Sequence, residues 1–428
     1  MSEAKSVRVK NTGLRGVVVA DTKISFIDGE NGVLIYRGYR IEELAGQSTF
    51  PETAFLLLNG YLPGKKELAQ FENMVLQARE LPEFIIEALK KFPKQSAPMD
   101  VLQACIPMLG MVDPELNDES REANFRKATR LIARVPAIVA AWNRIRRDEK
   151  PLPPDDSLSH AANFLWQLTG KAPDPQMARD FDVCLILHAD HTFNASTFGC
   201  REVVSTQAHM YAGTAAGVGA LSGSLHGGAN ERVMKMLLSV ESTLNSREEV
   251  CRWVRDKIEK GEKIMGMGHA VYKTIDPRAK ILRETSKRLG KQTGHERWYD
   301  YLTCIEEEGY KTFESRGKSN IRTNVDFYSG SVYAMMGIPV DIMTPVFAVS
   351  RTAGWCAHII EEKFAEAQEK PTLYRPEAQY VGDYCGLFGC TYEPFERREK
   401  TAATTTSAAG ATMTLSASEA YIMGYFNG

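Results

Sequence analysis

The stretch SREEVCRWVRDKIEKG, residues 246–261, decides the fold class of the chain. Ser246 is followed three residues later by Glu249, a capping box that is typical of the start of an α-helix. Gly261 supplies the glycine with which many helices end. The apolar residues between these signals share one helical face, as in a helix that packs on a core. They are Val250, Trp253, Val254 and Ile258.

Helix signals of this kind recur along most of the chain. PETAFLLLNG begins with Pro51 and ends at Gly60, and SLSHAANFLWQLTG has a serine start and a stop at Gly170. DPRAKILRETSKRLG predicts a helix that starts at Asp276 and ends at Gly290. Only the N-terminal part alternates like strands, with a DGENG turn between two β-branched runs. We therefore expect a mainly α protein with a short N-terminal β hairpin.

Composition restricts the classes of protein to consider. The 428 residues are 43% hydrophobic and 25% charged, with a net charge of −2, which gives no reason to expect a nucleic-acid partner. The N-terminus lacks the apolar core of a secretory signal, and no apolar run is long enough to span a bilayer. Eight cysteines without a C-x-x-C pair indicate reduced thiols. We expect a cytoplasmic protein with no membrane contact.

The stretch GMGHAVYKTIDPR begins like a phosphate-binding loop. A dinucleotide fingerprint needs a third glycine where this chain has Val271, and the stretch follows a predicted helix rather than a strand. Gly266 and Gly268 would still let the backbone approach a ligand closely. Arg278, in the first turn of the following helix, suits a carboxylate or phosphate. A solvated arginine in an ordinary loop is the alternative, and this segment alone leaves both open.

Three further segments carry candidate catalytic groups. GSLHGGAN places His226 among glycines, and TNVDFYSG places Asp326 between apolar neighbours, where a raised pKa would make it a base near neutral pH. LILHADHTFNAST puts His188 and His191 three apart, on one face of a predicted helix. A zinc site is not expected, because no H-E-x-x-H and no third ligand accompany them. Taken singly, each group is more often structural, because a lone histidine is usually a core residue and a lone aspartate in such a context is usually a helix cap.

Four motifs in fixed order resemble those of the citrate synthase family, which includes the 2-methylcitrate synthases. They are LHGGAN, GHAVYKTIDPRA, NVDFYSG and LYRPEAQYVG, and the similarity runs from about residue 13 to about residue 398. The resemblance implies a two-domain helical fold and an obligate homodimer. The large domain would comprise residues 1–227 and 329–398, and the small domain residues 228–328. The Ala/Thr/Ser-rich tail, 399–428, would lie outside both.

The resemblance also implies an activity. Acetyl-CoA would condense with oxaloacetate, and hydrolysis of the thioester would give citrate and CoA. A 2-methylcitrate synthase that uses propionyl-CoA is the first alternative, since one methylene changes pocket affinity by only ~1–3 kcal/mol. A non-catalytic helical binding protein on the same scaffold is the second. No metal and no organic cofactor are implied, because the acyl-CoA is a substrate.

Each motif implies roles for its residues. Asp326 matches the base that removes the α-proton of the acyl-CoA. His226 matches the residue that hydrogen-bonds the thioester oxygen, and His269 the residue that polarises the oxaloacetate carbonyl. These are the expected catalytic residues. An α-proton beside a thioester is a weak acid, so its removal needs a base together with stabilisation of the enolate oxygen.

Binding roles are implied for other residues. His191, Arg278 and Arg351 match binders of oxaloacetate, and Arg375 matches an arginine that reaches the site of the partner subunit. Arginines are suited to a dianion. The backbone expected to contact CoA comprises Ile264, Met265, Gly266, Met267 and Gly268.

The chain departs from the family pattern at two places. Ser224 stands where many relatives have proline, and Arg322-Thr323 replaces a common Tyr-Pro just before the NVD motif. The second departure lies four and three residues before the expected base, so it could alter how the Asp326 segment is held or admit a different acyl-CoA.

Overall fold

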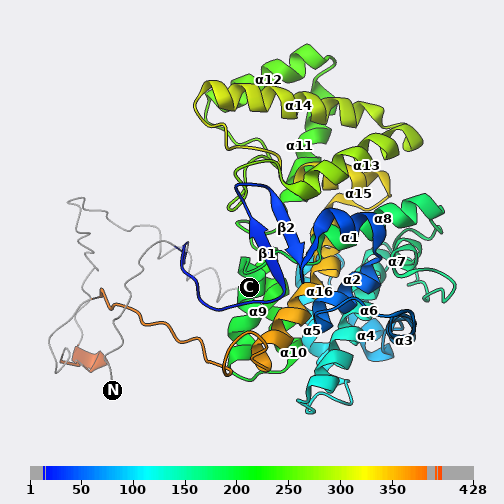
Figure 1. Ribbon diagram of the computed structural model, residues 1–428, viewed down its shortest axis with the longest axis vertical. Helices are drawn as coiled ribbons and strands as arrows, with labels where there is room; N and C mark the ends of the chain where they lie inside the picture. Colours follow the sequence, from blue (N-terminus) through cyan, green and yellow to red (C-terminus); the bar gives the residue numbers. More distant parts are fainter. Residues whose placement is uncertain (1–12, 15, 383–390, 393, 398–428) are drawn as a thin grey trace. The chain divides into compact units, whose positions relative to one another are not determined.

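The structure is a computed structural model of the chain (Figure 1). It describes residues 13–14, 16–382, 391–392 and 394–397. The chain divides into two units, Met1–Tyr374 and Arg375–Gly428. In the described residues, the first unit holds all sixteen α-helices and one small sheet, which confirms the mainly α prediction. The second unit holds the short 3-10 helix η2 (Phe395–Arg397), and the tail predicted for 399–428 lies outside the described residues.

The predicted N-terminal hairpin is present. Strand β1 (Ser25–Asp28) pairs antiparallel with β2 (Val33–Tyr36). A third strand, β3 (Tyr39–Arg40), extends the sheet and was not predicted. The hairpin turn meets a distant loop, because the backbone N–H of Lys273 donates to the carbonyl of Gly29 at 2.9 Å. The hairpin therefore supports the loop that carries the GHAVYK motif.

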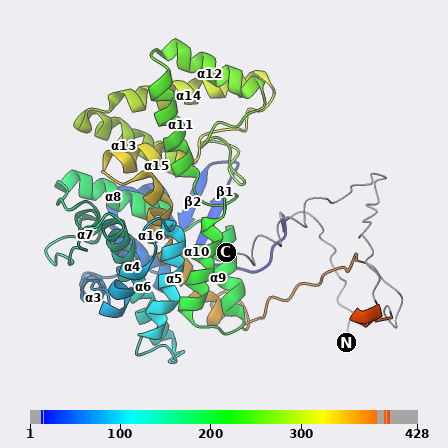
Figure 2. The ribbon, with the colours of Figure 1, turned by 180° about the vertical axis from the view of Figure 1, so that it is seen from behind.

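Most helices of the first unit pack around α16 (Met343–Lys363), which is buried along nearly its whole length. Helix α16 contacts α2, α5, α6, α8, α9 and α10 (Figures 1 and 2). The helices of this group are α1 (Ile41–Gln47), α2 (Phe50–Asn59), α3 (Lys65–Gln77), α4 (Glu83–Lys91), α5 (Pro98–Met111), α6 (Arg121–Ile145), α7 (His160–Thr169), α8 (Pro175–His188), α9 (Ala195–Ser205) and α10 (Met210–Ser222). The 3-10 helix η1 (Val340–Ile342) leads into α16.

A second group of helices packs largely on itself and lies at the top of Figure 1. Its members are α11 (Ala229–Thr243), α12 (Arg247–Glu259), α13 (Pro277–Thr293), α14 (Glu296–Ser315) and α15 (Asp326–Met335). Helix α12 packs on α14, and α15 packs on α11 and α13. The assignment of residues 228–328 to a separate small domain stays a prediction.

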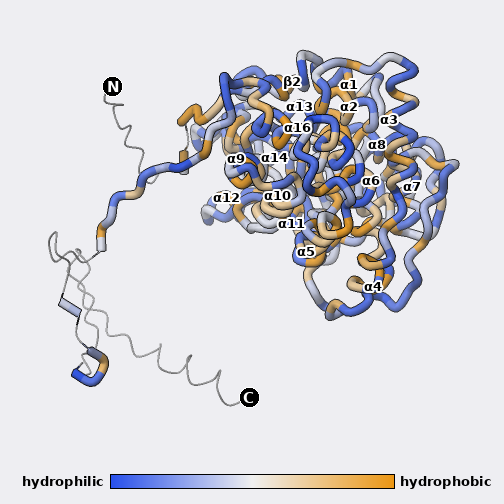
Figure 3. The backbone as a smooth tube through the Cα atoms, turned by 90° about the horizontal axis from the view of Figure 1, so that it is seen from below, coloured by the Kyte–Doolittle hydropathy of each residue, from blue (hydrophilic) through white to orange (hydrophobic). Residues whose placement is uncertain are grey.

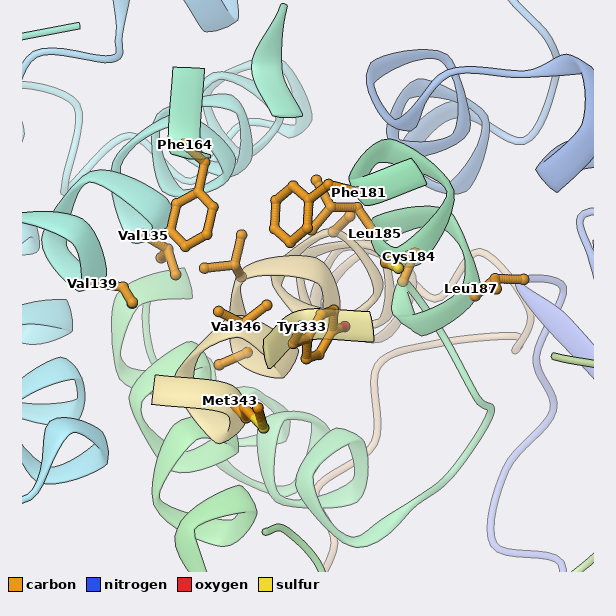
Figure 4. Close-up of a cluster of buried hydrophobic side chains, with 14 of the residues drawn as sticks. Val135, Val139, Phe164, Phe181, Cys184, Leu185, Leu187, Tyr333, Met343 and Val346 are labelled. Carbon is orange, nitrogen blue, oxygen red and sulfur yellow. The ribbon is translucent and has the colours of Figure 1, made fainter. Parts of the chain in front are cut away.

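Helix α15 joins the two groups through the core. Hydrophobic and hydrophilic segments alternate along the helical backbone, so each helix can bury one side (Figure 3). Tyr333 of α15 lies with Phe181 of α8 and Val346 of α16 in the cluster of Figure 4. The rings of Phe164 and Phe181 stack with centroids 5.2 Å apart. Because this end of α15 is fixed in the core, its first residue, Asp326, has a defined position.

Helix boundaries were mostly predicted correctly. Ser246 and Glu249 form the expected capping box of α12. The predicted end of α13 at Gly290 is wrong, because Gly290 is buried within the helix and Gly294, with φ of 74°, ends it. The prediction that His188 and His191 share a helical face is also wrong, since α8 ends at His188 and His191 lies in the following loop.

The described residues contain neither a membrane-spanning helix nor a metal-binding cluster. No helix there has both the length and the apolar character needed to cross a bilayer. No group of three or more His, Cys, Asp or Glu side chains there is arranged to hold a metal ion. Six cysteines are free thiols, five of them buried, while Cys385 and Cys390 lie outside the described residues.

Candidate active site

The loop between α12 and α13 is held beside the segment that leads into α15. The N–H of Gly268 donates to the carbonyl of Arg322 at 2.8 Å, and the N–H of Asn324 donates to the carbonyl of Gly266 at 3.0 Å. The Asn324 side chain adds a bond to the carbonyl of Gly268 at 2.9 Å. These bonds bring the GHAVYK motif and the NVD motif together, although they are far apart in sequence.

Gly266 is required by this close approach. Its φ is 78°, and a Cβ at this position would lie 2.8 Å from the Cα of Phe327. A side chain would therefore push the loop away from the start of α15. The N–H groups of Met267 and Gly268 are bonded to protein carbonyls, so any contact of the segment Ile264–Gly268 with CoA stays a prediction.

His269 is held in one tautomer by the loop backbone. Its Nδ1 accepts hydrogen bonds from the N–H groups of Val271 at 3.0 Å and Tyr272 at 3.2 Å. The proton of the neutral ring must then be on Nε2. Burial, aided by the charge of Arg278, lowers the pKa of His269 to about 4, so the ring is neutral at pH 7 and presents an Nε2–H donor.

A second histidine lies against the first. The ring centroids of His191 and His269 are 5.2 Å apart, and Tyr272 contacts both rings. His191 is buried, and its Nε2 has no hydrogen-bond partner among the described residues. Burial, aided by the charge of Arg278, holds the pKa of His191 well below its ordinary value. A neutral ring with an unused nitrogen is suited to a polar ligand.

Arg278 is fixed by the carboxylate that caps its own helix. Asp276 accepts from the Arg278 Nε at 3.0 Å and from a terminal nitrogen at 2.7 Å, and also accepts from the Arg278 backbone N–H at 3.0 Å. The pair is buried. Asp276 raises the pKa of Arg278 although burial opposes this. A guanidinium held on one edge can present its other edge to an anion.

Arg351 is a buried cation without a carboxylate partner. It is 1% exposed, its Nε donates to the carbonyl of His188 at 2.8 Å, and it forms no ion pair with any described residue. Arg201 is equally buried but is paired with Glu361 and Glu362, both at 2.7 Å. Burial lowers the pKa of Arg351, yet a guanidinium stays charged. Arg351 is therefore the clearest anion receptor of the candidate site.

His226 is held in the opposite tautomer from His269. Its Nε2 accepts from the backbone N–H of Ser196 at 3.2 Å, in the first turn of α9, and lies 2.9 Å from the Ser196 hydroxyl. The ring proton is then on Nδ1. Burial, with a smaller contribution from Arg351, lowers the pKa of His226 to about 4. The ring is a neutral Nδ1–H donor at pH 7.

Asp326 is the first residue of α15 and does not cap it. Its backbone N–H donates to the Asn324 side chain at 3.0 Å. Burial raises the pKa of the Asp326 carboxyl to about 6, against the opposing charges of Arg278, Arg232 and Arg351. A carboxylate with this pKa is ionised at pH 7 and more basic than an ordinary one.

Several of the predicted residues lie together in the structure, and Arg351 acts on His226 through its charge. His191, His269 and Tyr272 are in contact, and Arg278 and Arg351 act on Asp326 through their charges. Arg375 opens the second unit, so its role stays a prediction. A cavity of about 670 Å³ among α2, α3, α7 and α8 contains none of the predicted site residues.

Sequence reasoning missed several supporting residues. Asp276 was expected to cap a helix, but it also fixes Arg278. Ser196 fixes the His226 tautomer, and Asn324 joins the two motif segments. A carboxylate two residues before a functional arginine was a usable signal for Asp276. No sequence signal pointed to the role of Ser196, because Ser196 lies thirty residues before His226.

Comparison with known proteins gives a consistent result. The family model described as "Citrate synthase, C-terminal domain" matches residues 13–377. A citrate synthase of Haloferax volcanii is 42% identical, covering 87% of this chain and 95% of the relative. Citrate synthase 2 of Bacillus subtilis is 44% identical, covering 86% and 95%. A 2-methylcitrate synthase of Mycobacterium tuberculosis is 39% identical, covering 86% and 90%.

Solved structures agree with these relatives. Citrate synthase from Pyrobaculum aerophilum superposes with a TM-score of 0.83 at 37% identity, covering 92% of this chain and all of that one. The citrate synthase of Thermoplasma acidophilum, solved as a ternary complex with carboxymethyl coenzyme A and oxaloacetate, gives a TM-score of 0.80 at 32% identity. The covered shares are 90% of this chain and 98% of that chain.

Proposed function

The chain belongs to the citrate synthase family, and we propose that it condenses acetyl-CoA with oxaloacetate and hydrolyses the product thioester to citrate and CoA. It is then a transferase of the citrate synthase type. The observation that carries this proposal is a set of three groups under the charges of Arg278 and Arg351: two neutral imidazoles with fixed and opposite tautomers, and a carboxyl of raised pKa.

Oxaloacetate would be bound first by charge. It is a dianion, and Arg351 offers a buried positive charge that forms no ion pair with a described carboxylate, although the charge of Asp190 acts on it. Arg278 offers the edge of its guanidinium that Asp276 leaves free. The unused Nε2 of His191 completes a polar site. The ternary complex of the Thermoplasma acidophilum citrate synthase contains oxaloacetate, which is in keeping with this assignment.

Asp326 would then remove a proton from the methyl carbon of acetyl-CoA. Its pKa of about 6 allows it to be ionised at pH 7 and still accept a proton. The Nδ1–H of His226 would donate to the thioester oxygen as negative charge develops there. The two groups together produce an enol without a metal or an organic cofactor.

The new carbon–carbon bond forms at the oxaloacetate carbonyl. The enol carbon attacks the carbonyl carbon, and the electron pair of the carbonyl moves to its oxygen. The Nε2–H of His269 would hydrogen-bond this oxygen and supply its proton. The proton that Asp326 removed then returns to the His269 ring through water, so both groups regain their starting forms. Water then cleaves the thioester of citryl-CoA, which gives citrate and free CoA thiol.

Several finer points belong to this proposal. Residues 228–328 would form a small domain that closes over the substrates, and a homodimer would let Arg375 reach the site of the partner subunit. A cytoplasmic location and the absence of any cofactor are part of the same proposal. We assign acetyl-CoA and not propionyl-CoA as the substrate because two relatives named citrate synthases are 42% and 44% identical to this chain. The 2-methylcitrate synthase is 39% identical.

The test is a thiol-release assay with oxaloacetate and either acyl-CoA. We expect a higher kcat/KM for acetyl-CoA. A higher kcat/KM for propionyl-CoA would instead assign a 2-methylcitrate synthase. No thiol release with either substrate, from folded protein, would support a binding protein on the same scaffold.

A further inference from the structure

A buried carboxylate outside the proposed catalytic groups lies behind the Asp326 segment. Glu306 of α14 is 5% exposed. Its Oε2 accepts from the Tyr328 hydroxyl at 2.7 Å, and the Arg283 Nε lies 3.5 Å from the same oxygen. Its Oε1 lies 2.9 Å from the hydroxyls of both Tyr310 and Thr323. Such a buried charge is tolerated only where hydrogen bonds satisfy it.

The contacts of Glu306 reach both sides of Asp326. Thr323 lies three residues before Asp326, and Tyr328 lies two residues after it. The Thr323 and Tyr310 hydroxyls are also 2.6 Å apart, and the backbone N–H of Thr323 donates to the Tyr310 oxygen at 3.2 Å. One carboxylate therefore fixes the chain on both sides of the proposed base.

Thr323 also contacts the loop between α12 and α13 and the residue that caps α13. It forms a β-bridge with Met267, and its carbonyl accepts from the N–H of Asp276 at 3.2 Å. Thr323 belongs to the Arg322-Thr323 pair, which stands where the family resemblance leads us to expect Tyr-Pro, and a proline there could supply neither the hydroxyl nor the N–H. Arg322, the other, stacks over the Tyr310 ring at 4.5 Å and pairs with Glu314 at 2.5 Å.

We propose that Glu306 is a positioning residue that holds Asp326 in register with the substrate through Thr323 and Tyr328. No contact joins Glu306 to the Asp326 carboxylate in the described structure, so Glu306 acts through the backbone of the segment. The inference rests on the proposed function, because it assigns Asp326 the proton-abstraction step. Loss of this clamp, the hydrogen bonds of Glu306 to Thr323 and Tyr328, would slow that step. Arg278 would stay bound to the Asp276 side chain, and the Thr323 carbonyl would still accept from the Asp276 N–H, so the oxaloacetate site should be kept.

The experiment compares Glu306→Gln and Thr323→Val with the wild type. Both substitutions keep size while removing the charge or the hydroxyl. We expect kcat to fall by ~10- to 100-fold, as for a misplaced catalytic group, with the KM for oxaloacetate within about twofold. With trideuterated acetyl-CoA, the isotope effect on kcat should rise, because proton abstraction becomes slower than later steps. Thr323→Ser, which restores the hydroxyl, should recover the wild-type values.

Glu307→Gln is the matched control, since Glu307 is on the same helix, is half-exposed and pairs with Arg247 of α12. It should leave kcat and the isotope effect unchanged. Variants with a lower kcat but an unchanged isotope effect would show a loss of active protein only and would overturn the proposal. Amide hydrogen exchange of residues 322–328 needs no turnover. The exchange of these amides should be faster in Glu306→Gln than in the wild type. Unchanged exchange would overturn the positioning role of Glu306 even if the wild type proved inactive.

A separate observation concerns two thiols on α12 and α14. The sulfurs of Cys251 and Cys304 are 2.7 Å apart across a sequence separation of 53 residues. A disulfide needs about 2.05 Å, so a small rotation of the side chains would suffice. Cys251 is half-buried and Cys304 is buried, and burial raises the pKa of Cys304 to about 12. Cys251 is thus the thiol that a reagent reaches first.

We infer that Cys251 and Cys304 form a disulfide by exchange with a low-molecular-weight disulfide. The Cys251 thiolate attacks the reagent, which forms a mixed disulfide and releases one thiol. Cys304 loses its proton to water, and its thiolate attacks the Cys251 sulfur and displaces the second reagent thiol. The protein loses two electrons and two protons, and the reagent disulfide is reduced to two thiols. The bond would link α12 to α14.

Mass spectrometry after incubation with oxidised glutathione tests this inference. We expect a linked pair of peptides that contain Cys251 and Cys304, and a melting temperature higher than that of the reduced protein. Cys251→Ser should abolish the link, whereas Cys105→Ser, which changes a distant buried thiol, should keep it. Full alkylation of both thiols after the incubation, or a link between other cysteines, would overturn the inference.

Discussion

The carboxylate of Asp276 accepts a hydrogen bond of 3.2 Å from the backbone N–H of Val325. The same carboxylate holds the Arg278 guanidinium. One residue therefore sets both a proposed oxaloacetate receptor and the residue directly before the proposed base. The proposed anion-binding step and the proposed proton-abstraction step therefore both depend on Asp276.

Replacement of Asp276 should thus disturb both steps at once. In Asp276→Asn, the buried Arg278 loses its countercharge, which costs ~3–5 kcal/mol of stability when a buried pair is broken. We expect kcat/KM to fall by ~100-fold, because small displacements of catalytic groups have this effect. Steady-state kinetics and thermal unfolding measure the two effects. Asp341→Asn, which removes a half-exposed partner of Arg146, is the control and should change neither by much.

Arg351 and Arg201 should respond in opposite ways to the same substitution. Arg351→Gln removes a buried charge that has no carboxylate partner, so stability should hold while the KM for oxaloacetate rises ~10- to 100-fold. Arg201→Gln leaves Glu361 and Glu362 uncompensated, so the melting temperature should fall. The KM for oxaloacetate and the melting temperature of both variants test these two expectations. A large loss of stability in Arg351→Gln with an unchanged KM would contradict a receptor role.

His269 should be needed for chemistry more than for binding. His269→Ala removes the Nε2–H donor that the backbone contacts at Nδ1 leave free. Loss of one such donor typically lowers kcat by ~10²- to 10³-fold. The change should appear in kcat for thiol release, with a smaller effect on the KM for acetyl-CoA. A variant with wild-type kcat would remove His269 from the carbonyl-polarising role.

The pH dependence of kcat/KM should follow the ionisation of the Asp326 carboxyl. Burial raises its pKa to about 6, and only the ionised form can accept a proton. Below that value, kcat/KM should fall by about tenfold for each pH unit, and it should level off above it. The two histidines, with pKa values of about 4, stay neutral across this range. An acidic limb near pH 4 in place of pH 6 would contradict the assignment.

The local parts of the fold were predictable because local chemistry decides them. The capping box at Ser246, the hairpin and the Asp276 cap follow from neighbouring residues alone. The end of α13 was misplaced because Gly290 is tolerated inside the helix, where it packs near the backbone of Glu296. His191 was assigned to a helix because sequence spacing does not reveal that α8 ends at His188.

The candidate residues could be listed from the sequence, but their protonation states could not be derived from it. The motifs identify His226, His269 and Asp326, yet their protonation depends on contacts made across the fold. The Ser196 N–H fixes one ring and burial sets the basicity of Asp326. The Glu306 clamp comes from α14, which carries none of the recognisable motifs. Tertiary packing therefore determines what the motif residues can do.

The rate of thiol release by Asp326→Asn tests the central claim most directly. The substitution removes the base while keeping its shape. It should also raise stability above pH 6, because the native carboxyl has a raised pKa and its ionised form disfavours the folded state there. We predict that turnover with oxaloacetate and acetyl-CoA falls by at least ~10³-fold, in protein whose melting temperature at pH 8 is no lower than that of the wild type. Near wild-type turnover in this variant would contradict the account.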